Sequence, residues 1–373
     1  MHVAGLRVLV VGAGVAGLAA ARTLHGAGAS VRVVERSDHP TAEGAGLYLP
    51  GNAVRALREL GLEAEVTERA HRIERQRFSD HRGRRLFEVE VEQVWSGVGA
   101  CLALPRAELH AALLAGVGEV PVTWGTRPDD VTIDGQRVAV GLDDGSAGDY
   151  DLVLGADGVH STVRRLAFDA APDPRPVGQH ARRFVVAAEP AGLDRTWSVL
   201  LGRGASFLTI PIAGGRLYCY CDGPADSAAI PLRELLAGYA APVPDLLDLL
   251  EESPGTTIQE GIIEEVDLPT WSRGSVLLVG DAAHATSPNM AEGAAMALED
   301  AIVLTESLTT APDVASGITL FQQRRAPRTT WVRNQTHRRD RARSMPPVVR
   351  NPLLAGFGRH IFMSNYRPLR EPA

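Results

Sequence analysis

The chain has 373 residues, of which 45% are hydrophobic and 22% are charged, and its net charge is -7. This composition excludes a disulfide miniprotein, a disordered chain and a multi-span membrane protein, and the acidic balance argues against nucleic acid as a partner. Only three cysteines occur in so long a chain, which favours a reducing compartment. We therefore expect a cytoplasmic protein that acts on a small molecule.

The N-terminal segment predicts a strand, a glycine turn, a helix and a second strand. RVLVVGAG is an apolar β-branched run, VAGLAAARTLHGAG has helical composition and closes with glycines, and SVRVVER resumes as a strand. This order is typical of a buried parallel sheet. The glycines argue against a signal peptide, and no later segment is apolar for the ~18 residues that a spanning helix needs. We expect Asn52 to cap the next helix, AVRALRELGL.

Gly12, Gly14 and Gly17 form a GxGxxG motif between that first strand and helix. The first glycine allows the tight turn, the second lets a pyrophosphate approach the backbone, and the third allows close packing of helix on strand. Glu35 ends the second strand, where a carboxylate can accept hydrogen bonds from ribose hydroxyls. These residues predict an adenine dinucleotide site, but they do not distinguish NAD from FAD.

The remaining elements alternate between two kinds of sheet. Residues 69–100 and 172–265 contain alternating runs that predict antiparallel strands, with a Gly-Gly turn in IPIAGGRLYCYCD. Between them lie a helix, PRAELHAALLAGV, and a buried strand, DLVLGADG. SVLLVGDAAH is another buried strand, EGAAMALEDAIVLTESL is a helix, and the Arg-rich tail after about residue 318 is helical until Pro346 and Pro347.

Two further strand ends carry polar motifs. Asp157 follows one buried strand and Asp281 follows another, and ligands of open α/β sheets bind at the carboxyl ends of strands. The helix after Asp281 begins near Gly293, so the N–H groups of Gly293, Ala294 and Ala295 would present the positive helix end to an electron-rich ring. Such a helix end would stabilise a reduced flavin.

With these motifs in order, nearly the whole chain resembles the group A FAD-dependent monooxygenases, the aromatic hydroxylases similar to para-hydroxybenzoate hydroxylase. The resemblance rests on VVGAGVAGLAAA, VVERS, GAGLYLPGNAVRALRELGL, LPRAELHAALL, GADGVHSTVRR and GDAAHATSPNMAEGAAMALEDA. It implies noncovalent FAD held at these positions: Gly12, Gly14, Val15, Ala16, Gly17, Glu35, Arg36, Gly46, Arg106, Asp157, Gly280, Asp281, Pro288, Gly293, Ala294, Ala295 and Met296.

The resemblance also implies specific contacts and a reaction. Glu35 would bind the adenosine ribose, Arg106 the ribityl and phosphate region, and Asp281 the ribityl chain, while Asp157 would serve both FAD and the pyridine nucleotide. NADPH or NADH would reduce the flavin, which would capture O2 as a C4a-hydroperoxide and hydroxylate an electron-rich aromatic ring. No second GxGxxG is present, and the family resembles this chain in lacking a separate nicotinamide domain.

One position departs from the family, because Glu292 stands where Gln is common. A carboxylate there would repel an anionic reduced flavin or substrate. We hypothesise that the substrate is not a simple aromatic acid held at this point, or that Glu292 donates or accepts a proton. The alternative is a carboxylate that caps the helix and faces solvent.

Other candidates carry structural alternatives. His284 suits a general base but is also common in the family as a packing residue. Tyr218 and Tyr220 share one strand face, and Cys219 and Cys221 the other, so one pair could line the substrate cavity. Tyr48 could also face the ring. We predict no metal site, because the lone C-x-C lacks further ligands.

The Arg-rich segments could dock an NADPH phosphate or an acidic partner, although solvated faces are our default expectation. The apolar segment NPLLAGFGRHIFMSNY could cover the core, pair with another subunit or touch a membrane surface, and we rank these in that order. The protein would be a monomer or homodimer.

We therefore predict an α/β fold in which a Rossmann-like FAD domain is interleaved with an antiparallel-sheet substrate domain. The FAD domain would comprise 1–72, 101–171 and 266–317, the substrate domain 73–100 and 172–265, and a C-terminal helical region 318–373. The predicted function is NAD(P)H-dependent hydroxylation of an aromatic or related electron-rich molecule. Alternatives are an FAD oxidoreductase that reduces, epoxidises or cyclises a nonaromatic substrate, and a noncatalytic binding protein on the same fold.

Overall fold

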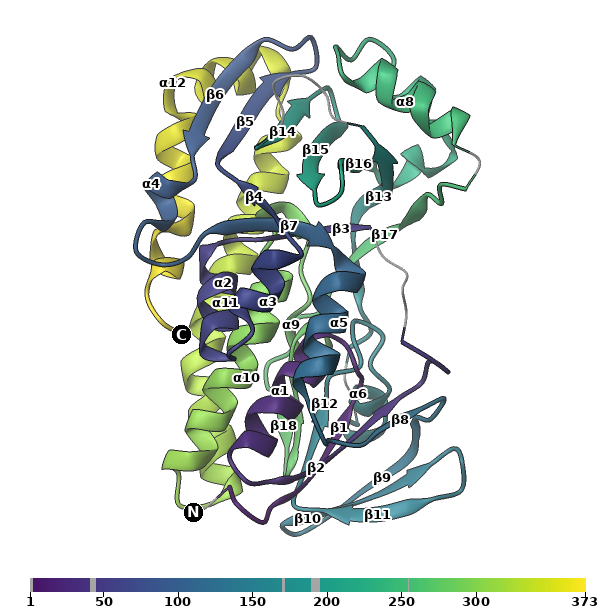
Figure 1. Cartoon of the computed structure of the whole chain (residues 1–373), viewed down its shortest axis with the longest axis vertical. Coiled ribbons are helices and arrows are strands. Elements are labelled where there is room, and N and C mark those ends of the chain that lie inside the picture. The colour runs from purple at the N-terminus through teal and green to yellow at the C-terminus, as the bar shows by residue number, and fades with distance from the viewer. Residues whose placement is uncertain (1–2, 41–44, 170–171, 189–194, 254) are drawn as a thin grey trace.

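A computed structural model of the protein describes residues 3–40, 45–169, 172–188, 195–253 and 255–373 (Figure 1). Its first layer is a sheet in the order β18-β19-β12-β1-β2-β8. These strands are β1 (Arg7–Val11), β2 (Ser30–Glu35), β8 (Val122–Trp124), β12 (Leu152–Gly155), β18 (Ser272–Arg273) and β19 (Val276–Leu278). All neighbours are parallel except β18 with β19. Because the apolar β-branched strands are covered on both faces, the sheet forms the main core.

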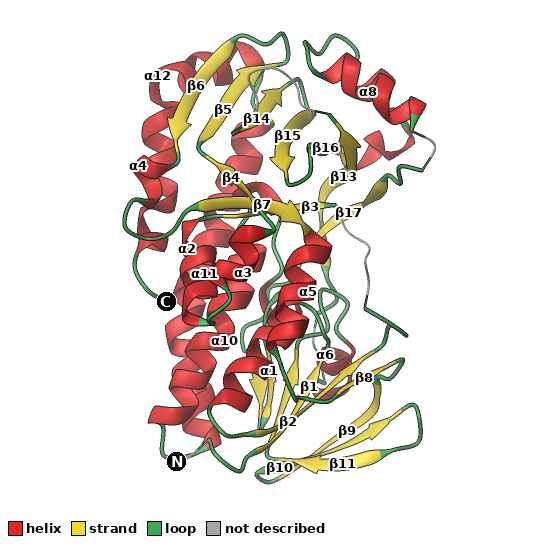
Figure 2. Cartoon of the chain, viewed as in Figure 1, coloured by secondary structure: helices red, strands yellow, loops and turns green. Residues whose placement is uncertain are grey.

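Helices cover one face of this sheet. The helix α1 (Val15–Gly26) packs against α10 (Gly293–Thr310), and α10 also packs against α2 (Gly51–Glu59) and α11 (Val314–Arg343). The opposite side carries a three-stranded antiparallel sheet of β9 (Pro128–Asp134), β10 (Arg137–Leu142) and β11 (Ala147–Tyr150), which contacts β1 and β12. Figure 2 shows most strands gathered toward two ends of the molecule, with β3, β4 and β7 between them.

The second large sheet has seven strands in the order β17-β13-β16-β15-β14-β5-β6. They are β5 (Arg75–Asp80), β6 (Arg85–Glu90), β13 (Arg175–Ala187), β14 (Thr196–Leu201), β15 (Ser206–Ile212), β16 (Arg216–Pro224) and β17 (Gln259–Glu265). The predicted Gly-Gly turn joins β15 and β16 through Gly214 and Gly215, both with positive φ. Among the described strands of this sheet, only β5 and β14 pair in parallel. The early strands β5 and β6 therefore complete a sheet whose other strands come from the middle of the chain.

Smaller elements connect the two sheets. The strands β3 (Gly46–Leu49), β4 (His71–Ile73) and β7 (Cys101–Pro105) form a three-stranded sheet between them. The remaining helices are α3 (Glu63–Glu68), α4 (Glu92–Trp95), α5 (Arg106–Gly116), α6 (Thr162–Ala167), α7 (Leu232–Leu235), α8 (Val243–Glu252), α9 (Asp281–His284) and α12 (Pro347–Tyr366), with short 3-10 turns at Ala225–Ala229, Pro288–Met290 and Arg367–Arg370. The predicted α/β fold class with a helical C-terminal region is confirmed, whereas the domain limits stay a prediction.

Asn52 was expected to cap α2, and this prediction is wrong. Pro50 occupies the cap position with φ -68° and ψ 170°, so the helix begins at Gly51 and Asn52 lies inside it, fully buried. Proline fixes the extended conformation that a helix cap needs, which starts the helix earlier than the Asn signal suggested. In the described part of the chain, no helix has both the length and the apolar character required to cross a bilayer.

Candidate functional site

The glycine turn between β1 and α1 combines close packing with open space. Gly12 has φ 108°, and a Cβ at Gly12 would collide with the carbonyl of Ala156, while one at Gly17 would collide with the carbonyl of Gly12. At Gly14 an added Cβ would meet nothing within 4 Å. Among the described residues no side chain caps α1, so its first N–H groups can bind a phosphate. This turn therefore fits the pyrophosphate of a dinucleotide.

Glu35 lies directly beside this turn. Its carboxylate accepts hydrogen bonds from the N–H groups of Ala13 at 2.8 Å and Ser37 at 3.0 Å, which fix it at the end of β2. The adjacent Arg36 is exposed. The carboxylate keeps acceptor sites for ribose hydroxyls, so its position fits the role implied by the resemblance.

The helix α5 contributes Arg106 and a residue that the sequence reasoning missed. The Arg106 side chain is exposed at the first position of the helix, while its N–H donates to the carbonyl of Ala45 at 3.0 Å. One turn later, His110 Nε2 lies 2.8 Å from the carbonyl oxygen of Ala13. The spacing of four residues puts both side chains on one helix face, and this was the signal available in the sequence. Gly44, the first residue of the quoted GAGLYLP motif, lies outside the described residues.

Asp157 organises the turn after β12. Its carboxylate accepts hydrogen bonds from Ser161 Oγ at 2.5 Å and from the N–H groups of Thr162 at 2.6 Å and Val163 at 3.1 Å. Burial raises the pKa of this carboxyl, although these donors oppose the effect. The buried Arg164 then joins α6 to α9 by donating to the carbonyl of Ala282 at 2.9 Å. Since Ala156 touches Gly12, Asp157 shapes the backbone against which the glycine turn packs.

A buried charge network supports the turn after β19. Asp300 Oδ2 accepts a hydrogen bond from the N–H of Gly280 at 2.8 Å and lies 2.7 Å from His284 Nε2, and Asp300 Oδ1 accepts one from Arg325 Nε at 2.7 Å. Burial alone would raise the pKa of Asp300, but His284 and Arg325 lower it to about 2. His284 is therefore held by the carboxylate of Asp300, and this contact fixes the position of the turn after β19. Asp281, next to Gly280, remains exposed.

The loop before α10 leaves its backbone open at the point expected to face the flavin ring. Pro288 and Gly293 are exposed, and an added Cβ at Gly293 would meet nothing within 4 Å. No side chain caps α10, so the first N–H groups of the helix, including those of Ala294 and Ala295, have no partner within it. The N–H of Met296 is already bonded to the carbonyl of Glu292 at 2.8 Å.

Glu292 does not face solvent, so that alternative is wrong. Its side chain is 2% exposed. Its Oε2 accepts a hydrogen bond from Asn52 Nδ2 at 2.9 Å, while Oε1 has no partner among the described residues. Burial raises the pKa of Glu292 to about 8. Asn52, which α2 brings from a distant part of the sequence, donates a hydrogen bond to Glu292 that opposes this rise in pKa. Glu292 thus carries a proton at neutral pH.

The seven-stranded sheet presents an aromatic face toward β3. Tyr218 packs on Gly46, where a Cβ would collide with its ring, and Trp197 lies 4.6 Å from Tyr48 between ring centroids. Burial raises the pKa of Tyr218 to about 12, which keeps its hydroxyl protonated. Tyr220 OH and Trp197 Nε1 are buried without a hydrogen-bond partner among the described residues. This face therefore offers aromatic surface with free polar groups.

The opposite face of the same sheet is purely structural. Cys219 and Cys221 alternate with the tyrosines and pack with Phe184, Phe207 and residues of α8 in a second apolar cluster. The predicted separation of tyrosines and cysteines is thus observed. All three cysteines of the chain are unpaired and buried. Within the described ranges, no cluster of three or more His, Cys, Asp or Glu side chains is arranged to hold a metal.

The Arg-rich tail is more buried than the solvated faces that we expected. Arg325 is fully buried against Glu299 and Asp300, and Arg328 lies 2.7 Å from Glu299. Acidic residues of α10 therefore neutralise this side of α11.

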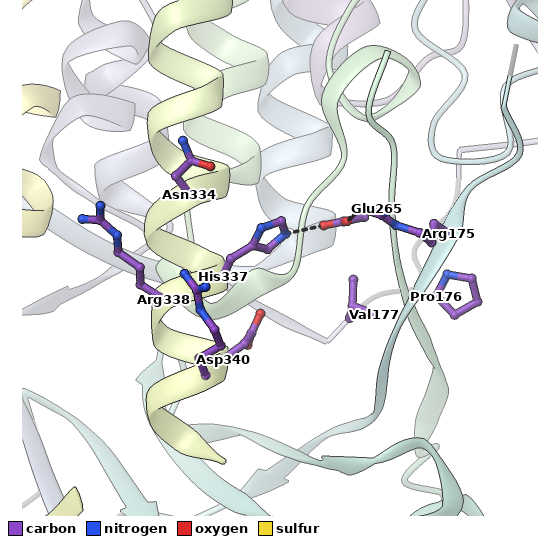
Figure 3. A pocket seen from close by; sticks show the side chains of 9 residues that line it. Arg175, Pro176, Val177, Glu265, Asn334, His337, Arg338 and Asp340 are labelled. Carbon is purple, nitrogen blue, oxygen red and sulfur yellow. Dashed lines mark hydrogen bonds and ion pairs between the residues drawn. The ribbon is translucent and has the colours of Figure 1, made fainter. Parts of the chain in front are cut away.

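A separate cleft of about 600 Å³ opens farther along α11, where His337 points toward Glu265 at 2.7 Å (Figure 3). Its other lining residues are Arg175, Pro176, Val177, Asn334, Arg338, Asp340 and Arg341.

Comparison with known proteins gives one family and a consistent set of relatives. Residues 5–180 and 263–333 match the family model described as "FAD binding domain". The chain is 35% identical over 346 residues to the 2-heptyl-3-hydroxy-4(1H)-quinolone synthase of Pseudomonas aeruginosa, which covers 89% of this chain and 88% of that protein. It is 29% identical over 338 residues to the FAD-dependent urate hydroxylase of Klebsiella pneumoniae, which covers 87% of this chain and 86% of that protein.

Solved structures agree with these relatives. The Klebsiella pneumoniae HpxO structure in complex with FAD and uric acid is 26% identical with a TM-score of 0.81, covering 98% of this chain and 92% of that one. The tetrameric form of 2-methyl-3-hydroxypyridine-5-carboxylic acid oxygenase is 26% identical with a TM-score of 0.80, covering 94% of this chain and 96% of that one.

Proposed function

Because this chain belongs to the family that carries this FAD-binding domain and is an FAD-dependent monooxygenase of the aromatic hydroxylase kind, we propose that its substrate is a fused-ring aromatic heterocycle with an oxo or hydroxyl group. The observation that carries this proposal is the sheet face with Trp197 and Tyr220, whose indole N–H and hydroxyl are buried without partners among the described residues. A buried donor left unpaired is costly. An oxygen of the substrate would satisfy these groups.

The relatives support the same chemical class. One is named a quinolone synthase and another a urate hydroxylase, and both names denote nitrogen heterocycles that carry oxygen substituents on the ring. The aromatic side chains of Tyr48, Trp197 and Tyr218 suit a flat ring system, because aromatic rings pack well in offset or tilted arrangements. Among such heterocycles, a hydroxyquinoline matches both the relatives and the mixture of apolar surface and polar groups.

The residues at the glycine turn and at α10 fit FAD. Gly14 leaves room for the pyrophosphate, Glu35 stands ready for the ribose, Asp281 is exposed for the ribityl chain, and the open backbone at Gly293 suits the ring edge. Bound FAD supplies the electron transfer and oxygen chemistry that side chains lack. For the reductant we propose NADPH or NADH, and for the oxidant O2.

This chain's own residues then orient the substrate and keep water away. Tyr218 stays protonated and can donate to a substrate oxygen, while the buried rings of Trp197 and Tyr48 exclude water from the reacting ring. The neutral Glu292 adds no negative charge near the start of α10 at neutral pH. The three unpaired cysteines support a cytoplasmic location.

The first test is a substrate screen with the FAD-loaded protein. Oxidation of NADPH and NADH in air is followed with 4-hydroxyquinoline, 2-alkyl-4-hydroxyquinolines, urate and 4-hydroxybenzoate. We expect a hydroxyquinoline to accelerate the oxidation and to yield a product heavier by one oxygen atom. Stimulation by 4-hydroxybenzoate alone, or by no aromatic compound, would contradict the proposed substrate class.

The second test removes the free donors while keeping an aromatic ring at each position. Tyr220→Phe and Trp197→Phe should each raise KM for the accepted heterocycle by about tenfold with a smaller effect on kcat, because each loses one substrate hydrogen bond of about 1–2 kcal/mol. Tyr239→Phe is the matched control, because the Tyr239 hydroxyl already donates to the carbonyl of Ala205 on the other side of the sheet. If Tyr220→Phe and Trp197→Phe had the same KM as Tyr239→Phe, this result would contradict the assigned role of Tyr220 and Trp197 as donors to the substrate.

A further inference from the structure

The helix α12 is apolar on two opposite faces. Its inner face packs Phe362 against Phe78, with ring centroids 6.0 Å apart, and against Tyr366 at 4.9 Å. Its outer face carries Val349, Leu353, Phe357 and Ile361, which follow one another at intervals of four residues and are 47%, 45%, 62% and 44% exposed. Figure 1 places the helix at the edge of the molecule, beside β6. A surface helix normally turns polar side chains outward, so this row requires an explanation.

The row dominates the exposed apolar surface of the protein. Among the described residues, only Ile258 and Ile262 of β17 and its approach are large exposed hydrophobics outside α12, which also carries Val348 at its start. Single exposed apolar side chains are ordinary, but a continuous row of them marks an interaction surface. At 1.5 Å per residue, the row from Val349 to Ile361 extends roughly 18 Å along the helix.

The segment that carries this row is positively charged although the whole chain is acidic. Residues 341–370 contain six arginines and no Asp or Glu, whereas the net charge of the chain is -7. Two of the six do not face a partner, because Arg343 is paired with Asp222 and Arg350 is buried. Arg341, Arg359 and Arg367 are exposed, and no carboxylate pairs with them in the portion of the chain that the structure covers. Arg359 donates a hydrogen bond to the neutral Gln93 Oε1 at 2.8 Å and so keeps its net charge. An apolar row flanked by exposed arginines that no carboxylate neutralises is complementary to a surface that is negatively charged outside and apolar beneath.

We propose that the outer face of α12 docks on an anionic lipid bilayer. Val349, Leu353, Phe357 and Ile361 would enter the boundary between headgroups and acyl chains, and the neighbouring arginines would bind acidic headgroups. A second copy of the chain suits the row less well. It would bring arginines against arginines, which like-charge repulsion disfavours.

Docking at this helix would place the bilayer close to the reaction site. The inner face of α12 ends at Tyr366, whose hydroxyl donates to the carbonyl of Met290 at 3.2 Å, in the loop before α10. Arg339 also contacts both Tyr366 and the carbonyl of Asn289 in that loop. The same helix thus faces the membrane and supports the site, an arrangement suited to a substrate that partitions into lipid. The docking itself does not depend on the proposed substrate.

The test is flotation of the full-length, FAD-loaded protein with lipid vesicles. We expect binding to vesicles of phosphatidylcholine with phosphatidylglycerol, weak binding to phosphatidylcholine alone, and release by high salt. Phe357→Ser and Leu353→Ser should each lower the partition coefficient by about tenfold, and Arg359→Gln by about fivefold on anionic vesicles only. Ile262→Ser is the matched control, since Ile262 is 56% exposed on a distant strand, and it should leave binding unchanged.

Three results would overturn the proposal. One is wild-type protein that fails to float with anionic vesicles, and another is Ile262→Ser that weakens binding as much as Phe357→Ser. The third is a dimer, found by light scattering, that Phe357→Ser dissociates while no form binds vesicles, since this assigns the row to a second copy. Flavin absorbance and the thermal unfolding midpoint, measured for every variant, show that loss of binding is not loss of fold.

Discussion

Glu292 shows how one buried carboxyl group links stability to pH. Its ordinary pKa of 4.5 is raised to about 8 in the folded protein, chiefly by burial. Between these values the unfolded chain releases the proton and the folded protein keeps it, so the free energy of unfolding falls as pH rises through this window. Each unit of displacement corresponds to about 1.4 kcal/mol, which makes the loss large enough to measure.

Glu292→Gln should remove this pH dependence, because the amide mimics the protonated acid and cannot ionise. We expect the thermal unfolding midpoint of the wild type to drop more steeply than that of the variant between about pH 5 and about pH 8. The exposed Glu252→Gln serves as the control and should follow the wild type. Parallel curves for wild type and Glu292→Gln would show that Glu292 is ionised in the folded state.

Gly14 and Gly17 of the first turn should separate by role when each is replaced. Gly17→Ala should destabilise the protein by about 1–3 kcal/mol, because its Cβ would collide with the carbonyl of Gly12. Gly14→Ala meets no atom within 4 Å, so it should fold normally yet bind FAD at least about tenfold more weakly, since the methyl group would block the pyrophosphate. Denaturant unfolding of the apoprotein and fluorescence titration with FAD distinguish the two effects, and a Gly14→Ala protein with unchanged FAD affinity would contradict the assignment.

At the scale of elements, α10 and α11 are joined by buried charges. Arg325 on α11 is fully buried and contacts Glu299 and Asp300 on α10 at 2.9 and 2.7 Å. Arg325→Met leaves both carboxylates without this partner, and breaking a buried ion pair on one side costs about 3–5 kcal/mol. Because Asp300 also holds His284 and the N–H of Gly280, the variant should lose FAD affinity as well.

The measurement is chemical denaturation of Arg325→Met beside Arg338→Met. Arg338 lies on the same helix but is exposed, so its replacement should change the free energy of unfolding by less than about 0.5 kcal/mol. Similar values for the two variants would mean that desolvation of Arg325 cancels the attraction between the charges.

At the scale of the whole molecule, local signals predicted the elements, and distant contacts escaped prediction. The runs of β-branched residues predicted the parallel sheet, and so did the glycines, which the backbone requires at the turn. Asn52 was misassigned as a cap because its partner Glu292 lies 240 positions away. The same separation hid the burial of Glu292, and Arg325 was expected in solvent because only tertiary packing brings acidic residues to it.

The sequence predicted the parts of the site that the backbone forms better than the parts that side chains form. The glycine turn, Glu35 and the start of α10 carry recognisable spacings, since the chain must bend or open there. The aromatic face with Trp197 and Tyr220 carries none, because neighbouring strands that meet across the sheet set its shape. His110 was overlooked for a similar reason, as its partner is a carbonyl group on another element.

The parallel pairing of β5 with β14 has a consequence for synthesis on the ribosome. Arg75 and Thr196 meet across 121 positions of sequence, so β5 emerges long before its neighbour exists. At about 5–20 residues per second, the side of β5 that pairs with β14 stays open for roughly 6–24 seconds. An unpaired edge is a template for pairing with other chains, so the nascent hairpin β5–β6 is the segment that a chaperone would most usefully shield during translation.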